Sequence, residues 1–264
     1  MGRIETVQSA DGTEIAFAVD GAGPALVLVH GTSADHTRWG PVLPALAKTF
    51  TTHAVDRRGR GLSGDAPAYS LDREYEDIAA VAESISGPVH LLGHSYGALV
   101  SLEAALRVGN LDRLVLYEPA FTVGTPLYPP GSRERLQAML DAGNREGLLV
   151  AFFSEIVGMD EAQIAVLRSE PAWQGRLAAA HTIIREFADA DYRFDPARFR
   201  GLDAPVLLLQ GEQSPAFLKE STTALHEALP RSRVAAMPGQ AHIAMSTAPD
   251  LFVRLVTQFL AGPG

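Results

Sequence analysis

The stretch Pro88-Val-His-Leu-Leu-Gly-His-Ser-Tyr-Gly-Ala-Leu-Val-Ser-Leu102 decides the fold of this chain. Its apolar run, residues 89–92, is typical of a buried strand, and the small-residue pattern after the second glycine is typical of a helix. Between them, Gly93-His-Ser-Tyr-Gly97 has the G-x-S-x-G spacing, in which a serine sits on a tight strand-to-helix turn. The two glycines leave room where strand and helix cross. Ser95 is therefore a candidate nucleophile.

Composition describes an ordinary globular protein and excludes several function classes. The chain has 264 residues, of which 47% are hydrophobic and 20% charged, with a formal net charge of −9. Such an acidic balance argues against a nucleic-acid partner and favours a small-molecule substrate. The sequence contains no cysteine, which excludes disulfides, thiolate metal sites and a cysteine nucleophile. We expect a cytoplasmic monomer or homodimer that needs neither metal nor cofactor and does not enter a membrane.

Hydrophobic patterning predicts one α/β domain with a mostly parallel sheet and helices on both faces. Strands are expected at residues 3–8, 13–19, 25–29, 50–55, 89–92, 113–117, 205–209 and 233–237. The first two form an antiparallel hairpin across the turn residues Ala10-Asp-Gly12. Helices are expected near residues 39–47, 71–86, after Ser95, and at 215–229 and 249–260.

The alternation stops between residues 120 and 199, where helical segments are expected at 133–143, 145–157, 160–169 and 171–190. Nearly 80 residues without a strand, inside an alternating chain, indicate a helical insertion placed over the sheet. The predicted organisation is thus a core of residues 1–119 and 200–264 with a helical cap of residues 120–199.

Over nearly its whole length the chain resembles the α/β-hydrolase fold family. The matching residues are His30-Gly31, Asp56-Arg-Arg-Gly-Arg-Gly61, Gly93-His-Ser-Tyr-Gly97 and Gly239-Gln-Ala-His242. They follow the third, fourth, fifth and eighth expected strands, in the family's order. The resemblance implies an eight-stranded sheet, a helical cap and a serine hydrolase.

The resemblance also implies the base and the oxyanion donors. His242 lies in the loop after the eighth strand, where the family's catalytic histidine is found. The backbone N–H groups of Thr32 and Tyr96 are the expected oxyanion hole. Of the nearby histidines, His30 is expected to support the oxyanion loop and His94 to be structural, pointing away from the nucleophile by alternation. His36 is a further candidate to line the site.

The acid departs from the family's usual pattern. Most relatives have an aspartate in a Gly-x-x-Asp turn after the seventh strand, but this turn reads Gly211-Glu-Gln-Ser214. An imidazolium without a carboxylate partner loses tautomer control and charge stabilisation. Some members carry the acid after the sixth strand, where Glu118 lies. We predict that Glu118 orients His242, with Glu212 in reserve and a solvated strand-end charge as the alternative role for Glu118.

The Gly-rich loop 56–64 is expected to be architectural, braced by Asp56 or Arg57. It is not a phosphate cradle, because no helix beginning Gly-Lys-Ser/Thr follows it.

The candidate pocket residues are mostly apolar, which favours a small to medium, uncharged, hydrophobic carboxylic ester as substrate. The candidate wall consists of Trp39, Phe121, Tyr128, Phe153, Trp173 and Ile243, with Tyr96, Leu127 and Phe152 beside them.

Several other enzyme activities occur on the same fold. A lactonase is the first alternative, followed by a carbon–carbon bond hydrolase or a thioesterase, which use the same three groups. Ser95 argues against haloalkane dehalogenases and epoxide hydrolases, which have an aspartate at the elbow. A non-enzymatic ligand receptor on the hydrolase fold is the alternative from another class, since such proteins often lose part of the triad.

Overall fold

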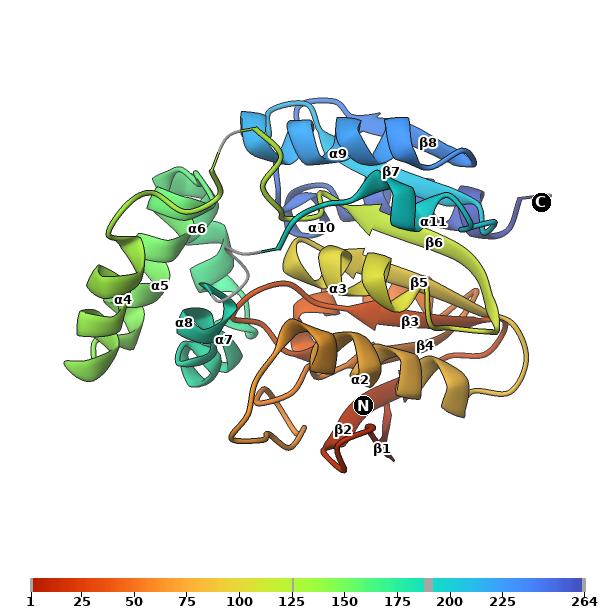
Figure 1. Ribbon diagram of the computed structural model, residues 1–264, viewed down its shortest axis with the longest axis horizontal. Helices are drawn as coiled ribbons and strands as arrows, with labels where there is room; N and C mark the ends of the chain where they lie inside the picture. Colours follow the sequence, from red (N-terminus) through yellow and green to blue (C-terminus); the bar gives the residue numbers. More distant parts are fainter. Residues whose placement is uncertain (1, 125, 188–191, 263–264) are drawn as a thin grey trace.

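The computed structural model describes residues 2–124, 126–187 and 192–262 and contains an eight-stranded sheet. The strand order is β1-β2-β4-β3-β5-β6-β7-β8 (Figure 1). β1 and β4 pair antiparallel with β2, and the remaining pairs are parallel. The predicted hairpin and mostly parallel sheet are confirmed. The strands are β1 (Arg3–Gln8), β2 (Glu14–Asp20), β3 (Ala25–Val29), β4 (Thr51–Val55), β5 (Val89–His94), β6 (Leu111–Tyr117), β7 (Val206–Gly211) and β8 (Ser232–Met237).

Helices cover both faces of the sheet because its central strands are buried on both sides. One face packs on α2 (Leu71–Ser84), α3 (Tyr96–Ala104), η4 (Pro196–Phe199) and α9 (Ala216–Ala228). The other packs on η1 (His36–Trp39), α1 (Leu43–Leu46), α10 (Ala244–Thr247) and α11 (Pro249–Leu260). The predicted helix near residues 39–47 is thus two short pieces, and Val42 with Pro44 begins the second.

Between β6 and β7 the chain forms a helical layer beyond the carboxyl ends of the parallel strands (Figure 1). It consists of α4 (Ser132–Asp141), α5 (Arg145–Ala151), η2 (Phe152–Ile156), α6 (Glu161–Ser169), α7 (Trp173–Ala179) and α8 (Thr182–Glu186). Its apolar cluster includes Leu148, Phe153 and Ile183, together with Ile243 from the loop after β8. The layer therefore rests on the loop that carries His242.

Two of the helices predicted in this layer are interrupted. The segment 145–157 is α-helical only to Ala151 and continues as the π-helical η2, where the Ser154 hydroxyl donates to the Val150 carbonyl. The segment 171–190 divides into α7 and α8, where the Thr182 hydroxyl donates to the Ala179 carbonyl. Residues 188–190 of that prediction lie outside the described residues.

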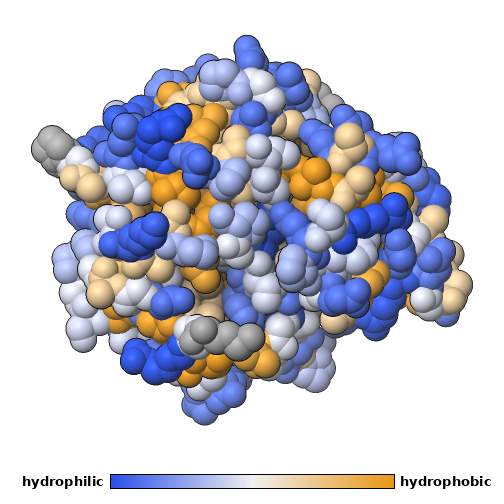
Figure 2. All heavy atoms as spheres, turned by 180° about the vertical axis from the view of Figure 1, so that it is seen from behind, coloured by the Kyte–Doolittle hydropathy of each residue, from blue (hydrophilic) through white to orange (hydrophobic). Residues whose placement is uncertain are grey.

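Among the described residues, no helix is both long and apolar enough to span a bilayer. Seen from behind, hydrophilic residues cover much of the surface and hydrophobic ones form small separate groups (Figure 2). Large exposed apolar side chains, such as Leu62 and Val123, are scattered over different elements. Such scatter is ordinary for a protein surface.

Candidate active site

Ser95 occupies the turn between β5 and α3 with a positive φ, at φ 57° and ψ −124°. A Cβ at Gly97 would collide with the carbonyl oxygens of Val29 and His30, and one at Gly93 would lie 2.6 Å from Ser101 Oγ. Glycine is therefore required at both positions. The Ser95 N–H donates to the carbonyl of Tyr117 at 2.9 Å, which joins this turn to the end of β6.

Glu118 follows β6 directly, and its carboxylate lies against the imidazole of His242. Oε2 is 2.5 Å from His242 Nδ1, and Oε1 accepts a 2.6 Å hydrogen bond from the N–H of Gly211. Glu118 is fully buried and His242 is 4% exposed, so solvent hardly screens the pair. Glu118 has φ 48°, a strained value for a residue with a Cβ. The structure thus brings together the two side chains predicted as acid and base.

The loop that carries His242 is held by hydrogen bonds to its backbone. His94 Nε2 donates to the His242 carbonyl at 2.9 Å, and the two rings lie 4.6 Å apart. Burial, followed by the nearby His242, lowers the pKa of His94 well below its usual value, which favours the neutral ring. The Tyr117 hydroxyl donates to the Ala241 carbonyl and accepts from the Ala244 N–H at 3.1 Å. His94 holds this loop, but it lines the cavity with Ser95 and does not point away from the nucleophile as predicted.

The carboxyl end of β7 supplies no acid to His242. Ser214 is buried, and its hydroxyl has no hydrogen-bond partner among the described residues. Glu212, the reserve candidate, instead accepts from the Gly239 N–H at 2.9 Å.

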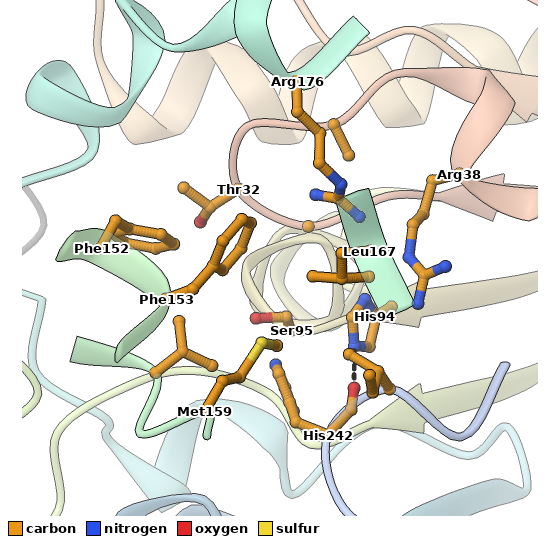
Figure 3. Close-up of a pocket in the computed structure, with 14 residues that line it drawn as sticks. Thr32, Arg38, His94, Ser95, Phe152, Phe153, Met159, Leu167, Arg176 and His242 are labelled. Carbon is orange, nitrogen blue, oxygen red and sulfur yellow. Dashed lines mark hydrogen bonds between the residues drawn. The ribbon is translucent and has the colours of Figure 1, made fainter. Parts of the chain in front are cut away.

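Ser95 and His242 line the same two cavities, and Figure 3 shows the Ser95 hydroxyl beside the His242 ring. These two described side chains make no direct hydrogen bond. Catalytic hydrogen bonds are often long before substrate binds and tighten in the complex. The arrangement leaves space above both groups for a reacting acyl carbon.

The backbone N–H groups of Thr32 and Tyr96 have no acceptor within the described part of the chain. Thr32 precedes Ser33, which has φ 55°, and Tyr96 opens α3. His30 Nδ1 donates to the Gly31 carbonyl at 2.8 Å, while its Nε2 accepts from the Arg57 N–H at 3.2 Å. His30 therefore braces the loop in which Thr32 lies, as expected.

Strained backbone is concentrated at this site. The only non-glycine residues with positive φ in the described ranges are Ser33, Ser95 and Glu118. Residues held in such conformations cluster at functional sites, where the surrounding structure fixes them. All three residues lie at or beside groups selected from the sequence.

Two cavities meet at Ser95 and His242. The first is bounded by Phe152, Phe153, Leu167 and Ile243 among others. The second is bounded mainly by apolar and aromatic side chains. Those of the second cavity include Tyr96, Leu127, Tyr128, Phe152, Ile156, Phe217 and Leu218.

Part of the predicted pocket wall is wrong. Trp39 packs in the core between the sheet and α11, Phe121 packs on Tyr192 and Phe194, and Trp173 packs behind Phe153. None of the three lines either cavity. By contrast, Tyr128, Phe153 and Ile243 do line them.

Sequence reasoning missed two cationic residues of the first cavity, Arg38 from η1 and Arg176 from α7. Both are almost completely buried. The expectation of an apolar pocket is therefore incomplete. Neither arginine belongs to a recognisable motif, and only the tertiary packing brings them to Ser95.

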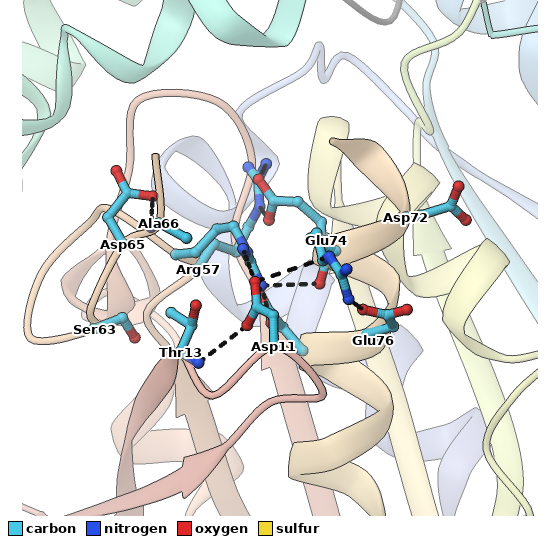
Figure 4. A network of polar contacts seen from close by, with 12 residues as sticks. Asp11, Thr13, Arg57, Ser63, Asp65, Ala66, Asp72, Glu74 and Glu76 are labelled. Carbon is cyan, nitrogen blue, oxygen red and sulfur yellow. Dashed lines mark hydrogen bonds and ion pairs between the residues drawn. The ribbon is translucent and has the colours of Figure 1, made fainter. Parts of the chain in front are cut away.

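The Asp56–Gly64 loop is held by ionic contacts, in line with the architectural role expected of it. Asp56 accepts from the N–H groups of His36 and Leu62, and Arg57 donates to Glu74 at 2.8 and 2.9 Å (Figure 4). His36 Nδ1 lies 2.9 Å from both oxygens of Asp56. His36 lines neither cavity at Ser95, contrary to expectation.

Asp35, His36 and Asp56 are the one group of described side chains close enough to share a metal ion. The direct contact between His36 and Asp56 accounts for their proximity as an ion pair. Burial and the hydrogen bond to Asp56 act oppositely on His36, and the hydrogen bond prevails and raises its pKa.

Comparison with known proteins identifies the family. A model described as the alpha/beta hydrolase family matches residues 26–255. The crystal structure of an alpha/beta hydrolase from Sphaerobacter thermophilus is 36% identical, with a TM-score of 0.85, and the match covers 97% of this chain and 100% of that one.

Two curated relatives match most of the chain. The 2-(acetamidomethylene)succinate hydrolase of Mesorhizobium japonicum is 28% identical over 91% of this chain and 89% of its own. The pimeloyl-[acyl-carrier protein] methyl ester esterase of Aeromonas hydrophila is 29% identical over 91% of this chain and 96% of its own. The elbow, the fold and these matches agree: the chain belongs to the alpha/beta hydrolase family and is a hydrolase.

Proposed function

We propose that this protein hydrolyses a carboxylic ester through a Ser95-His242-Glu118 triad. The observation that carries the proposal is the 2.5 Å contact between Glu118 Oε2 and His242 Nδ1, beside the cavities that Ser95 lines. A buried carboxylate on Nδ1 leaves Nε2 of the neutral ring free to accept a proton. That is the tautomer a general base needs.

The proposed reaction follows from these positions. His242 Nε2 takes the hydroxyl proton as Ser95 Oγ attacks the carbonyl carbon, and the carbonyl oxygen becomes an oxyanion held by the N–H groups of Thr32 and Tyr96. The imidazolium, stabilised by Glu118, then protonates the departing alcohol, leaving an acyl-enzyme. Water attacks the acyl-enzyme with His242 again as base, and the carboxylic acid departs.

The helical layer is proposed to be the cap that shapes substrate selectivity. Phe152 and Phe153 of η2 and Leu167 of α6 close the cavity opposite Ser95. The cap is attached to the core by ion pairs, since Glu186 of α8 contacts Arg57 at 2.9 Å and also Arg60. A change in these helices is expected to alter which ester is accepted more than whether Ser95 reacts.

A second candidate is hydrolysis of an amide. One relative is named a methyl ester esterase, which favours the ester, whereas the other is named for an acetamido compound. Both reactions use the same acyl-enzyme and differ in the leaving group. Lactones and thioesters fit the same mechanism and are separated from simple esters only by assay.

The test is a panel of substrates assayed with Ser95→Ala as the blank. It contains p-nitrophenyl esters of graded acyl length, the matching anilides, lactones and thioesters. The proposal expects Ser95-dependent turnover that is fastest on an ester with a short acyl chain. Fastest turnover on anilides or lactones selects those alternatives, and no Ser95-dependent turnover on any member favours a ligand receptor.

A further inference from the structure

The first cavity contains two guanidinium groups that the proposed reaction does not use. Arg38 reaches it from the core and Arg176 from the helical layer. In Figure 3 Arg176 extends from the helical layer toward Leu167 and His94, and Arg38 lies beside His94, on the side away from Ser95. Arg38 is 1% exposed and Arg176 is 4% exposed, so both charges are buried. Two segments distant in sequence thus place cations at the cavity that the candidate nucleophile lines.

These guanidinium groups are incompletely paired. Arg38 Nη1 donates to Ser246 Oγ at 2.8 Å and lies 3.4 Å from Glu170 Oε2, but its Nε and Nη2 have no partner within the described ranges. Arg176 makes no side-chain hydrogen bond or ion pair to a described residue. Its guanidinium lies 5.4 Å from the ring centre of Phe153, with Nε unpartnered. Several N–H donors of these two cavity-lining side chains therefore have no acceptor among the described residues.

Arg57 is a buried arginine with carboxylate partners, and it serves as the comparison for Arg38 and Arg176. It makes three hydrogen bonds to the carboxylates of Glu74 and Glu186. Burial opposes its charge, but these carboxylates prevail and raise its pKa. Arg38 and Arg176 differ, because burial lowers both of their pKa values, that of Arg176 to about 9.

The acidic groups near Arg38 and Arg176 do not supply close counter-ions to both guanidinium groups. Glu170 raises the pKa of both arginines, but its contact with Arg38 is long and it makes no ion pair with Arg176. Asp35 also acts on Arg176 from a distance, while its own carboxylate accepts from the N–H of Thr37 at 2.9 Å. Burial lowers the pKa of Arg176 most, and repulsion from Arg38 lowers it next.

Two buried, partly unpaired guanidinium groups in one cavity form a receptor for an anion. A guanidinium presents N–H donors in a planar fork that matches a carboxylate, and such a contact is strong where water is excluded. Burying cations without a counter-ion is unfavourable, so their retention beside a nucleophile indicates a ligand that supplies the missing charge.

We propose that Arg38 and Arg176 bind a carboxylate carried by the acyl part of the substrate, so that the natural ester is a half-ester of a short dicarboxylic acid. The inference rests on the proposed function, because it places the scissile carbonyl at Ser95. The free space in the cavity is about 30 Å³, room for only a few water-sized groups, so the carboxylate lies only a few bonds from that carbonyl. The second, more apolar cavity then receives the alcohol.

The experiment compares monoethyl succinate with ethyl succinamate, its uncharged isostere. For the wild type, kcat/KM is expected to favour the half-ester by about 30-fold, typical of hydrogen bonds to a charged group. Arg176→Gln is expected to bring the ratio near one, with Arg176→Lys between. Arg133→Gln, an exposed arginine of α4 outside both cavities, removes the same charge and should keep the wild-type ratio.

A binding measurement separates this inference from the proposed function. Succinate is titrated calorimetrically into Ser95→Ala and into Ser95→Ala/Arg176→Gln, neither of which needs to turn over. We expect succinate to bind Ser95→Ala, and to bind Ser95→Ala/Arg176→Gln at least tenfold more weakly. Ser95-dependent turnover without preference for the half-ester overturns the inference and leaves the esterase intact. If neither ester is hydrolysed, the esterase proposal fails. The calorimetric titration then decides whether the carboxylate site exists. A Ser95→Ala protein that does not bind succinate overturns the carboxylate site.

Discussion

Glu118 and His242 are in contact across the carboxyl edge of the sheet, with Oε2 of one 2.5 Å from Nδ1 of the other. Glu118 has a positive φ of 48° where the chain leaves β6. The acid thus comes from the strand beside the nucleophile elbow, one strand nearer to Ser95 than the end of β7.

Replacing Glu118 by Gln is expected to lower kcat by about a thousandfold, because the ring loses the charge that fixes its tautomer and stabilises its protonated form. The amide has nearly the same shape, so the melting temperature should change little. The comparison is steady-state kinetics beside circular dichroism, with Ser214→Ala as the matched control. Near-normal turnover of Glu118→Gln, or a large loss in Ser214→Ala, would show that another group serves as the acid.

Gly31→Ala is expected to impair turnover at least tenfold with a small loss of stability. A Cβ at this position would lie 3.0 Å from Ser95 Cβ and 3.1 Å from the His94 carbonyl oxygen, so the nucleophile and the oxyanion loop must move apart. Gly109→Ala is the control, because its Cβ would meet no atom within 4 Å. Equal kinetics for the two variants would contradict the proposed geometry.

Two arginine variants should change stability in opposite directions. Arg57→Gln breaks buried contacts with Glu74 and Glu186 and is expected to lower the free energy of unfolding by about 3–5 kcal/mol. Arg176→Gln removes a buried, poorly paired charge and should raise that free energy by about 1 kcal/mol. Urea unfolding measures both. A loss of several kcal/mol in Arg176→Gln would assign Arg176 a structural role instead.

His36 should make stability depend on pH. Its hydrogen bond to Asp56 raises its pKa above the ordinary 6.5, so the folded state favours the charged ring. The stabilisation of the folded state by the charged His36 ring is fully present below pH 6.5. It is lost as the pH rises through the folded-state pKa of His36. The melting temperature of His36→Gln should therefore fall below wild type most at pH 6 and least at pH 9. A difference that grows with pH would reverse the assigned sign.

Local sequence patterns were sufficient to predict the sheet and the nucleophile turn. Continuous apolar runs such as 25–29 are strands because a parallel sheet buries both faces, and the G-x-S-x-G spacing located Ser95 because only glycine fits where β5 and α3 cross. The missing aspartate at Ser214 directed attention to Glu118, which the structure places on His242.

What could not be predicted depends on tertiary packing. An aromatic side chain in a buried segment suits either a core or a pocket, so Trp39 and Trp173 were assigned to the wall although they pack behind it. Arg38 and Arg176 gave no signal, because an arginine in a helix is usually exposed. Their role depends on the helical layer placing α7 over η1.

The most direct test of the triad is the mass of the intact protein after exposure to a fluorophosphonate probe. We predict one adduct per wild-type chain, mapped to Ser95, absent in Ser95→Ala and formed at least about a hundredfold more slowly in Glu118→Gln. A wild-type protein that stays unlabelled, or an adduct that persists in Ser95→Ala, would contradict the account.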